Sequence, residues 1–135
     1  MTPAGAPVAY LDASAFVKLL TPEPESLALR AALEDWPVRV SSQLLEIEAG
    51  RFALRAGEPV GQRVAAALER VSLIAIGDGI RKLAGEVEPA ALRSLDAIHL
   101  ATALSLGSEL GALFAYDRRL LEAAEQNGLL ALSPS

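Results

Sequence analysis

The sequence predicts an α/β fold, a three-layer α/β/α sandwich in which a mainly parallel sheet of about five strands lies between helices. Three observations predict it. Short apolar runs alternate with longer segments of helical periodicity along the whole chain. Such alternation indicates βαβ units, whose parallel sheet is covered on both faces. A length of 135 residues and a hydrophobic content of 52% suit one domain with a real core, here residues 1–135.

The apolar runs are too short for helices and are predicted as strands. They are Val8–Leu11, Val38–Val40, Ser72–Ile76, Ala112–Tyr116 and Leu129–Leu132. Apolar residues at helical spacing predict helices between them. These are Ala13–Leu20, Glu23–Trp36, Ser42–Ala56, Val60–Arg70, Gly79–Glu86, Leu95–Leu106 and Arg118–Gln126. Turn residues support these boundaries: prolines 22 and 24 separate the first two helices, Gly57–Pro59 separates the next pair, and Asn127-Gly128 is typical of a helix C-terminus.

Composition excludes several classes of function. The chain has no cysteine, which excludes disulfides, thiolate zinc sites and a cysteine nucleophile, and a single histidine excludes the usual multi-histidine metal sites. A net charge of −5 argues against a simple basic surface for nucleic acid. The first residues lack a basic segment before an apolar stretch, and no run is long enough for a membrane span. We therefore expect a cytoplasmic protein without membrane association.

Two aspartates follow apolar runs directly. Asp12 comes after Val8–Leu11, and Asp117 comes after the run that ends at Tyr116. Each is therefore expected at the carboxyl end of a strand, where ligands gather in open α/β sheets. Aspartate is also a favoured helix N-cap, and a capping aspartate can still face a cleft.

Two further acids lie on helix faces expected to be buried. At about 100° per residue, Glu48 falls in the middle of the apolar stripe of its helix, whereas Glu46 faces solvent. A pair with Arg51 or Arg55 on the same helix is the structural alternative for Glu48. Asp96 is the only charged residue of an otherwise apolar helical segment, where Ser94 is a candidate N-cap and the helix dipole favours an anion.

The four acids Asp12, Glu48, Asp96 and Asp117 would repel one another if they met without compensation. A divalent cation removes this repulsion, and Mg²⁺ or Mn²⁺ prefers oxygen ligands. Such a site activates water for phosphodiester hydrolysis. We therefore predict a Mg²⁺ (or Mn²⁺) site formed by these carboxylates.

Several residues near these acids are candidates for supporting roles. Ser14 lies two positions after Asp12 and is placed to donate a hydrogen bond to a carboxylate or a bound water. His99 lies one turn after Asp96, where a lone histidine is more often a satisfied core residue. Ser42 is expected to cap the third helix. The segment Gly77–Gly79 is a turn, because its glycine spacing matches no phosphate-binding loop.

Arginines near the four acids are candidates for contact with phosphate. They are Arg51, Arg55, Arg118 and Arg119. Solvated surface charge is the alternative for each of them.

Four motifs together resemble the PIN-domain family, most closely its VapC-type toxins. They are Tyr10–Ala15, Ser41-Ser42 with Glu48–Arg51, Leu95–Ala103, and Tyr116–Leu120 with Gly128-Leu129. The resemblance runs from Tyr10 to Pro134, and its four acids fall on Asp12, Glu48, Asp96 and Asp117. Ala115 departs from the family, which often has Ser or Thr at that position, so a hydroxyl near Asp117 is missing.

The resemblance implies a PIN-like fold and a Mg²⁺- or Mn²⁺-dependent endoribonuclease that cuts structured RNA such as tRNA or rRNA. It also implies a homodimer and inhibition by a cognate VapB-type antitoxin. The alternative is a catalytically weak PIN-like module that binds RNA or a partner, which the alanine at position 115 keeps open. A signalling receiver domain is disfavoured, because neither Lys18 nor Lys82 is placed near the end of the last strand.

Overall fold

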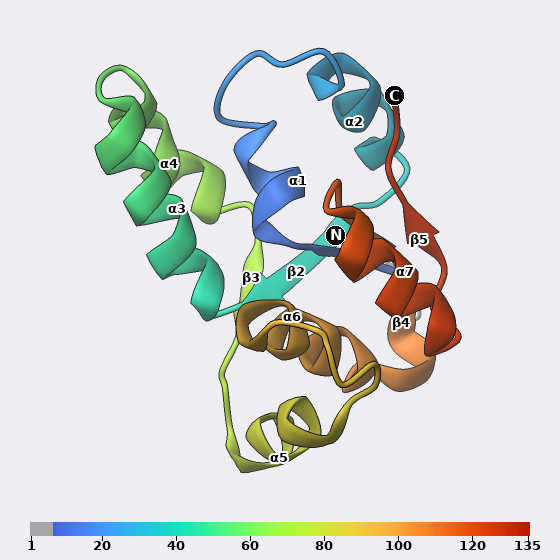
Figure 1. Ribbon diagram of the computed structural model, residues 1–135. Coiled ribbons are helices and arrows are strands. Elements are labelled where there is room, and N and C mark those ends of the chain that lie inside the picture. Colours follow the sequence, from blue (N-terminus) through green and yellow to red (C-terminus); the bar gives the residue numbers. More distant parts are fainter. Residues whose placement is uncertain (1–6) are drawn as a thin grey trace.

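A parallel five-stranded sheet lies at the centre of the computed structural model, which describes residues 7–135 (Figure 1). The strands are β1 (Val8–Leu11), β2 (Val38–Ser42), β3 (Ser72–Ile74), β4 (Leu110–Phe114) and β5 (Ala131–Leu132). Their order across the sheet is β3-β2-β1-β4-β5, and each neighbouring pair is parallel. The predicted parallel sheet of about five strands is therefore confirmed, with β1 at its centre.

Helices cover both faces of this sheet, as predicted for a three-layer α/β/α fold (Figure 1). They are α1 (Ala13–Val17), α2 (Ser26–Leu33), α3 (Leu44–Ala56), α4 (Val60–Leu68), α5 (Asp78–Glu86), α6 (Ser94–Leu104) and α7 (Arg118–Gln126), with a short 3₁₀ turn at Gly107–Glu109. Helices α1–α4 lie on one face, whereas α6 and α7 lie on the other with α5 packed on α6.

The central strand β1 supplies residues to both hydrophobic cores, because successive side chains of a strand point to opposite faces. Ala9 and Leu11 belong to the core beneath α1–α4, and Tyr10 belongs to the core beneath α6 and α7. All three side chains are fully buried. Within residues 7–135, no helix is both long enough and apolar enough to cross a bilayer.

Several predicted boundaries are wrong by a few residues. Strand β4 occupies Leu110–Phe114 instead of Ala112–Tyr116, because it extends back across Gly111, where its register with β1 shifts by one residue. Helix α1 ends at Val17 rather than at residue 20, and β5 begins at Ala131 rather than at residue 129. Helix α2 begins at Ser26 instead of residue 23, because a residue that precedes proline disfavours helical backbone.

The cap predictions had mixed outcomes. Ser42 is the last residue of β2 and not the N-cap of α3, although its Oγ accepts a hydrogen bond from the Leu44 N–H at 3.1 Å. Ser94 is the first residue of α6, and the extended residue Arg93 occupies the N-cap position. Asn127 is confirmed as the C-cap of α7, and Gly128 follows it with a φ of +82°.

Gly111 permits the close packing of Trp36 on β4. A Cβ at this position would overlap the Trp36 ring and lie 2.8 Å from the Cβ of Pro7. The Trp36 ring in turn meets the ring of Phe114 edge to face, with 5.6 Å between their centroids.

We expect Gly111→Ala to destabilise the protein by about 1–3 kcal/mol, because overpacking must displace the Trp36 ring. Gly85→Ala is the matched control, since nothing lies within 4 Å of a Cβ placed at Gly85 in α5. The control is expected to be neutral or to stabilise by up to about 1 kcal/mol. Urea denaturation measures both changes, and an equally stable Gly111→Ala protein would contradict this account of the packing.

Candidate active site

The carboxyl ends of β1 and β4 lie side by side at the end of the sheet where its parallel strands finish. Leu11 pairs with Phe114 in the ladder, and the Asp12 N–H donates to the Phe114 carbonyl at 3.2 Å. Asp12 therefore leaves the sheet next to the segment that leads to Asp117. Both aspartates are confirmed as N-caps, Asp12 of α1 and Asp117 of α7.

Asp12 is a buried carboxylate held by two donors, the Ser14 hydroxyl and the Ala15 N–H. Its Oδ1 accepts from the Ala15 N–H at 2.9 Å, and the Ser14 Oγ lies 2.7 Å from Oδ1 and 2.8 Å from Oδ2. The predicted bond from Ser14 to a carboxylate is thus present. The Ser14 hydroxyl also accepts a hydrogen bond from the Tyr116 N–H at 2.8 Å, which ties Asp12 to the exit of β4.

Burial dominates the electrostatics of Asp12, whose residue is only 4% exposed. Loss of solvent raises the pKa of Asp12 from 3.8 to about 6, although the charge of His99 and the bonds from Ser14 and Ala15 oppose this rise. The negative charge of Glu48 adds to it. Among residues 7–135, no cationic side chain offsets the effect of burial enough to keep the pKa of Asp12 at its usual value.

Glu48 is paired across the fold and not along its own helix. The Oε1 of Glu48 on α3 lies 2.7 Å from the Nε2 of His99 on α6. The structural alternative, an ion pair with Arg51 or Arg55, is absent from the ion pairs of residues 7–135. Glu48 keeps 20% of its side chain exposed, so its carboxylate still reaches the surface, and Glu46 is exposed as predicted.

His99 connects Glu48 to the central strand. Its Nδ1 lies 2.6 Å from the hydroxyl of Tyr10, and both side chains are buried. Burial raises the pKa of Tyr10 far above its usual value of 10, so the hydroxyl stays protonated. An ionised carboxylate only accepts hydrogen bonds, so the Nε2–H of His99 donates to Glu48, and the Nδ1 of His99 shares a hydrogen bond with the Tyr10 hydroxyl.

Tyr10 is the member of this network that sequence reasoning missed. It lies 89 positions from His99 along the chain, so no local spacing connects the two residues. The alternation along β1 is the signal that was available, because it places Tyr10 on the face opposite Leu11, toward α6.

Asp96 lies in the first turn of α6, half-buried. Burial raises the pKa of Asp96, and the negative charges of Asp117 and Glu48 raise it further, whereas His99 and Arg93 oppose the rise. Glu48 therefore lies within electrostatic range of Asp12 and of Asp96, and Asp117 lies within range of Asp96.

The four acids do not form a closed set of metal ligands. Over residues 7–135, no three acidic or histidine side chains stand close enough together to hold an ion as they lie. One Asp117 oxygen, Oδ1, accepts from the N–H groups of Arg119 and Leu120 at 2.9 and 3.3 Å. The four carboxylates nevertheless offer oxygen ligands, which Mg²⁺ and Mn²⁺ prefer. Burial raises the pKa of Asp12 and of Asp96, and a bound cation would favour the ionised form of both.

The arginines predicted to support the site differ in position. Arg51 and Arg55 line a hollow of about 470 Å³ together with Ser14 and Glu48. Arg118 is exposed beside Asp117 in the first turn of α7. Ala115 is fully buried in the core beneath α6 and α7, where a serine or threonine hydroxyl would meet apolar neighbours.

We expect Asp12→Asn to stabilise the metal-free protein near pH 7.5 by about 1–3 kcal/mol, because the variant carries no buried charge. In the folded protein the pKa of Asp12 is raised from 3.8 to about 6, so protonation of Asp12 at low pH stabilises the unsubstituted protein. This stabilisation is lost as the pH rises through about 6. The advantage of the variant should therefore shrink by roughly 1 kcal/mol at pH near 5. Urea denaturation in EDTA at both pH values tests this, with exposed Asp35→Asn as the control, and a pH-independent difference would refute it.

We expect Tyr10→Phe to cost about 1–3 kcal/mol of stability, because it leaves the buried Nδ1 of His99 without a partner. Tyr116→Phe removes a hydroxyl that donates to the half-exposed carbonyl of Pro134 at 2.7 Å, and is expected to cost only about 0.5–1 kcal/mol. Equal losses in the two variants would show that the contact between Tyr10 and His99 contributes nothing specific.

Comparisons with known proteins agree with this arrangement. The family model described as the PIN domain matches residues 9–126. Ribonuclease VapC46 of Mycobacterium tuberculosis is 45% identical over 126 residues, which cover 93% of this chain and 97% of that protein. Ribonuclease VapC47 of the same species is 39% identical over 134 residues, with 93% and 96% covered.

Solved structures show the same fold. A toxin–antitoxin complex from Klebsiella pneumoniae contains a chain with a TM-score of 0.70 and 25% identity, covering 94% of this chain and 98% of that one. VapC20 of Mycobacterium tuberculosis, a Sarcin-Ricin loop cleaving toxin, has a TM-score of 0.71 at 15% identity, with 93% and 99% covered. VapBC2 from Rickettsia felis, bound to a DNA fragment from its promoter, has a TM-score of 0.69 at 12% identity, with 95% and 99% covered. The chain belongs to the PIN-domain family, in which its curated relatives are VapC ribonucleases.

Proposed function

We propose that this protein is a metal-dependent endoribonuclease, the toxin of a VapBC-type toxin–antitoxin module, that hydrolyses phosphodiester bonds in structured RNA such as tRNA or rRNA. One observation carries the proposal. The acids Asp12, Glu48, Asp96 and Asp117 come from separate elements, and Glu48 interacts electrostatically with Asp12 and Asp96, as Asp117 does with Asp96. The 45% identity to a ribonuclease over nearly the whole chain supports the same reaction class.

Asp12 and Asp96 are the residues that we propose to hold Mg²⁺ or Mn²⁺, with Glu48 and Asp117 completing the site. When bound, such an ion lowers the pKa of a coordinated water and offsets the charge that develops on the phosphate. Ser14 holds the Asp12 carboxylate in one orientation, because it donates to that carboxylate and accepts from the Tyr116 backbone. His99 occupies Oε1 of Glu48, and the Glu48 residue also lines the hollow.

Arg51 and Arg55 are placed to contact the RNA backbone. They line the hollow that contains Glu48, and their guanidinium groups offset its negative charge toward an approaching phosphate. The net charge of −5 disfavours tight non-specific binding, so we expect a nuclease that selects its RNA by shape.

A VapB-type antitoxin is the proposed inhibitor, and a homodimer is the proposed assembly. Two of the structural relatives are toxin–antitoxin assemblies, which supports the first part. Exposed apolar side chains on α2 and α3, Leu27 at 82% and Leu54 at 74%, offer area for contact with a partner or a second copy.

A catalytically weak PIN-like module that binds RNA or a partner is the second candidate. The observation that favours it is the absence, across residues 7–135, of three acids close enough to hold an ion as they lie. The two candidates differ in whether RNA is cut.

We expect purified, antitoxin-free protein to cleave RNA in Mn²⁺ or Mg²⁺, and Asp12→Ala or Asp96→Asn to lower the rate by roughly 100-fold or more. Loss of even an outer partner of a metal site costs about 10–100-fold. Asp35→Asn removes an exposed acid outside the site and should leave the rate unchanged. Mapping of RNA 5′ ends after induced expression identifies the target.

Retained cleavage in EDTA, or in both site variants, would reject the metal-site assignment. Bound but uncut RNA under all metal conditions would favour the second candidate.

A further inference from the structure

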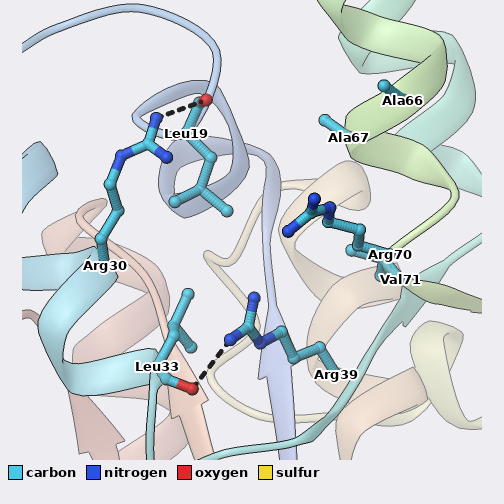
Figure 2. A pocket seen from close by; sticks show the side chains of 8 residues that line it. All are labelled: Leu19, Arg30, Leu33, Arg39, Ala66, Ala67, Arg70 and Val71. Carbon is cyan, nitrogen blue, oxygen red and sulfur yellow. Dashed lines mark hydrogen bonds between the residues drawn. The ribbon is translucent and has the colours of Figure 1, made fainter.

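A second polar pocket lies away from the carboxylates, between α2 and α4 on the face covered by α1–α4 (Figure 2). Its volume is about 360 Å³, and three arginines line it: Arg30 on α2, Arg39 on β2 and Arg70 between α4 and β3. Figure 2 shows Arg30 on one side of the pocket, with its guanidinium at the Leu19 carbonyl, and Arg39 and Arg70 on the other side. The remaining lining side chains are apolar.

Two of the three arginines are held in place by backbone carbonyls. Arg30 donates to the Leu19 carbonyl at 2.9 Å. Arg39 donates from Nη2 to the Leu33 carbonyl at 2.9 Å and from Nε to the Trp36 carbonyl at 3.0 Å. These bonds orient the guanidinium groups without neutralising them, because carbonyls carry no net charge. Other N–H groups of both arginines remain available, since each guanidinium has five donors. Arg30 and Arg70 are exposed, and Arg39 is half-buried.

The pocket concentrates positive charge in a protein that is acidic overall. No aspartate or glutamate is among its lining residues, and no ion pair of residues 7–135 involves any of the three arginines. Burial and the neighbouring charge of Arg70 both lower the pKa of Arg39. Two like charges near one another repel, and an anion bound between them relieves the repulsion. The arrangement therefore fits a negatively charged ligand.

The number and origin of the arginines indicate the class of that ligand. A carboxylate is planar and is satisfied by one guanidinium in a bidentate pair. A phosphate group presents oxygens in several directions and is matched by donors that come from more than one side, as the three arginines do here. We propose that this pocket is a phosphate-binding site formed by Arg30, Arg39 and Arg70. The phosphate belongs to an RNA strand or to a free phosphate compound.

The pocket is separate from the candidate active site. Arg39 pairs with Ala9 in the ladder, so it lies beside a residue three positions before Asp12 on the central strand. At about 3.3 Å per residue, roughly 10 Å of strand separates that position from Asp12. A phosphate bound in this pocket would therefore lie apart from the four carboxylates, none of which lines it.

The test uses inorganic phosphate as the probe and protein NMR of the arginine Nε–H groups as the readout, in EDTA. We expect saturable shifts of the Arg39 and Arg70 signals. Arg70→Gln should weaken phosphate binding about tenfold, since it removes a charge-assisted contact. This variant spares the backbone bonds that Arg39 makes, so it is expected to fold. Arg81→Gln, which removes an exposed guanidinium on α5, is the matched control and should leave the affinity within about twofold.

An RNA oligonucleotide, titrated in EDTA so that metal-dependent cleavage does not proceed, distinguishes the two sources of phosphate. Competition with inorganic phosphate at Arg39 and Arg70 assigns the pocket to an RNA strand, and binding of phosphate without competition assigns it to a free phosphate compound. Because both titrations run without metal, they stay informative if the nuclease proposal fails.

Three results would overturn the proposal. They are no saturable shift with phosphate, equal effects of Arg70→Gln and Arg81→Gln, and binding of a glutamate-rich peptide where phosphate does not bind. The last result would assign the pocket to an acidic protein partner.

Discussion

The buried carboxylate of Asp12 is the constraint on which the rest of the site depends. Ionised groups are rarely buried without a partner, because the loss of solvent disfavours the charge. Asp12 is 4% exposed and receives hydrogen bonds only from neutral donors, Ser14 and the Ala15 backbone. The fold tolerates this cost because β1 and β4 exit side by side and the cap of α1 needs an acceptor there. The raised pKa of Asp12 marks the place where a bound cation would be favourable.

His99 gives this end of the sheet its internal order. It links Glu48 on α3 to Tyr10 on β1, and thus joins helices on opposite faces of the sheet through one imidazole ring. Both ring nitrogens are used, and across residues 7–135 no buried side-chain nitrogen or oxygen lacks a hydrogen-bond partner. His99 is thus a buried residue whose ring nitrogens both have hydrogen-bond partners, and it also positions the Glu48 carboxylate near the surface. A role in the core and a role beside the site are therefore compatible.

Local chemistry was predictable from the sequence, and contacts between distant segments were not. The alternation of strands and helices, the caps at Asp12 and Asp117 and the bond from Ser14 follow from neighbours along the chain. The partner of Glu48 was not predicted, because the sequence offers only the local arginines 51 and 55 as an alternative, whereas His99 lies 51 positions away and is brought near by the fold. The clustering of Arg30, Arg39 and Arg70 has no sequence signature, since the three come from different elements.

We propose that the four carboxylates bind a divalent ion at the carboxyl end of the sheet. Crystals grown with Mn²⁺ and measured by anomalous diffraction test this most directly. We expect an anomalous peak in contact with Asp12 and Asp96, with Glu48 or Asp117 beside it. The hydrogen bond between His99 and Glu48 should be retained. A structure at saturating Mn²⁺ with no peak at these carboxylates, or with the ion bound only elsewhere, would contradict it.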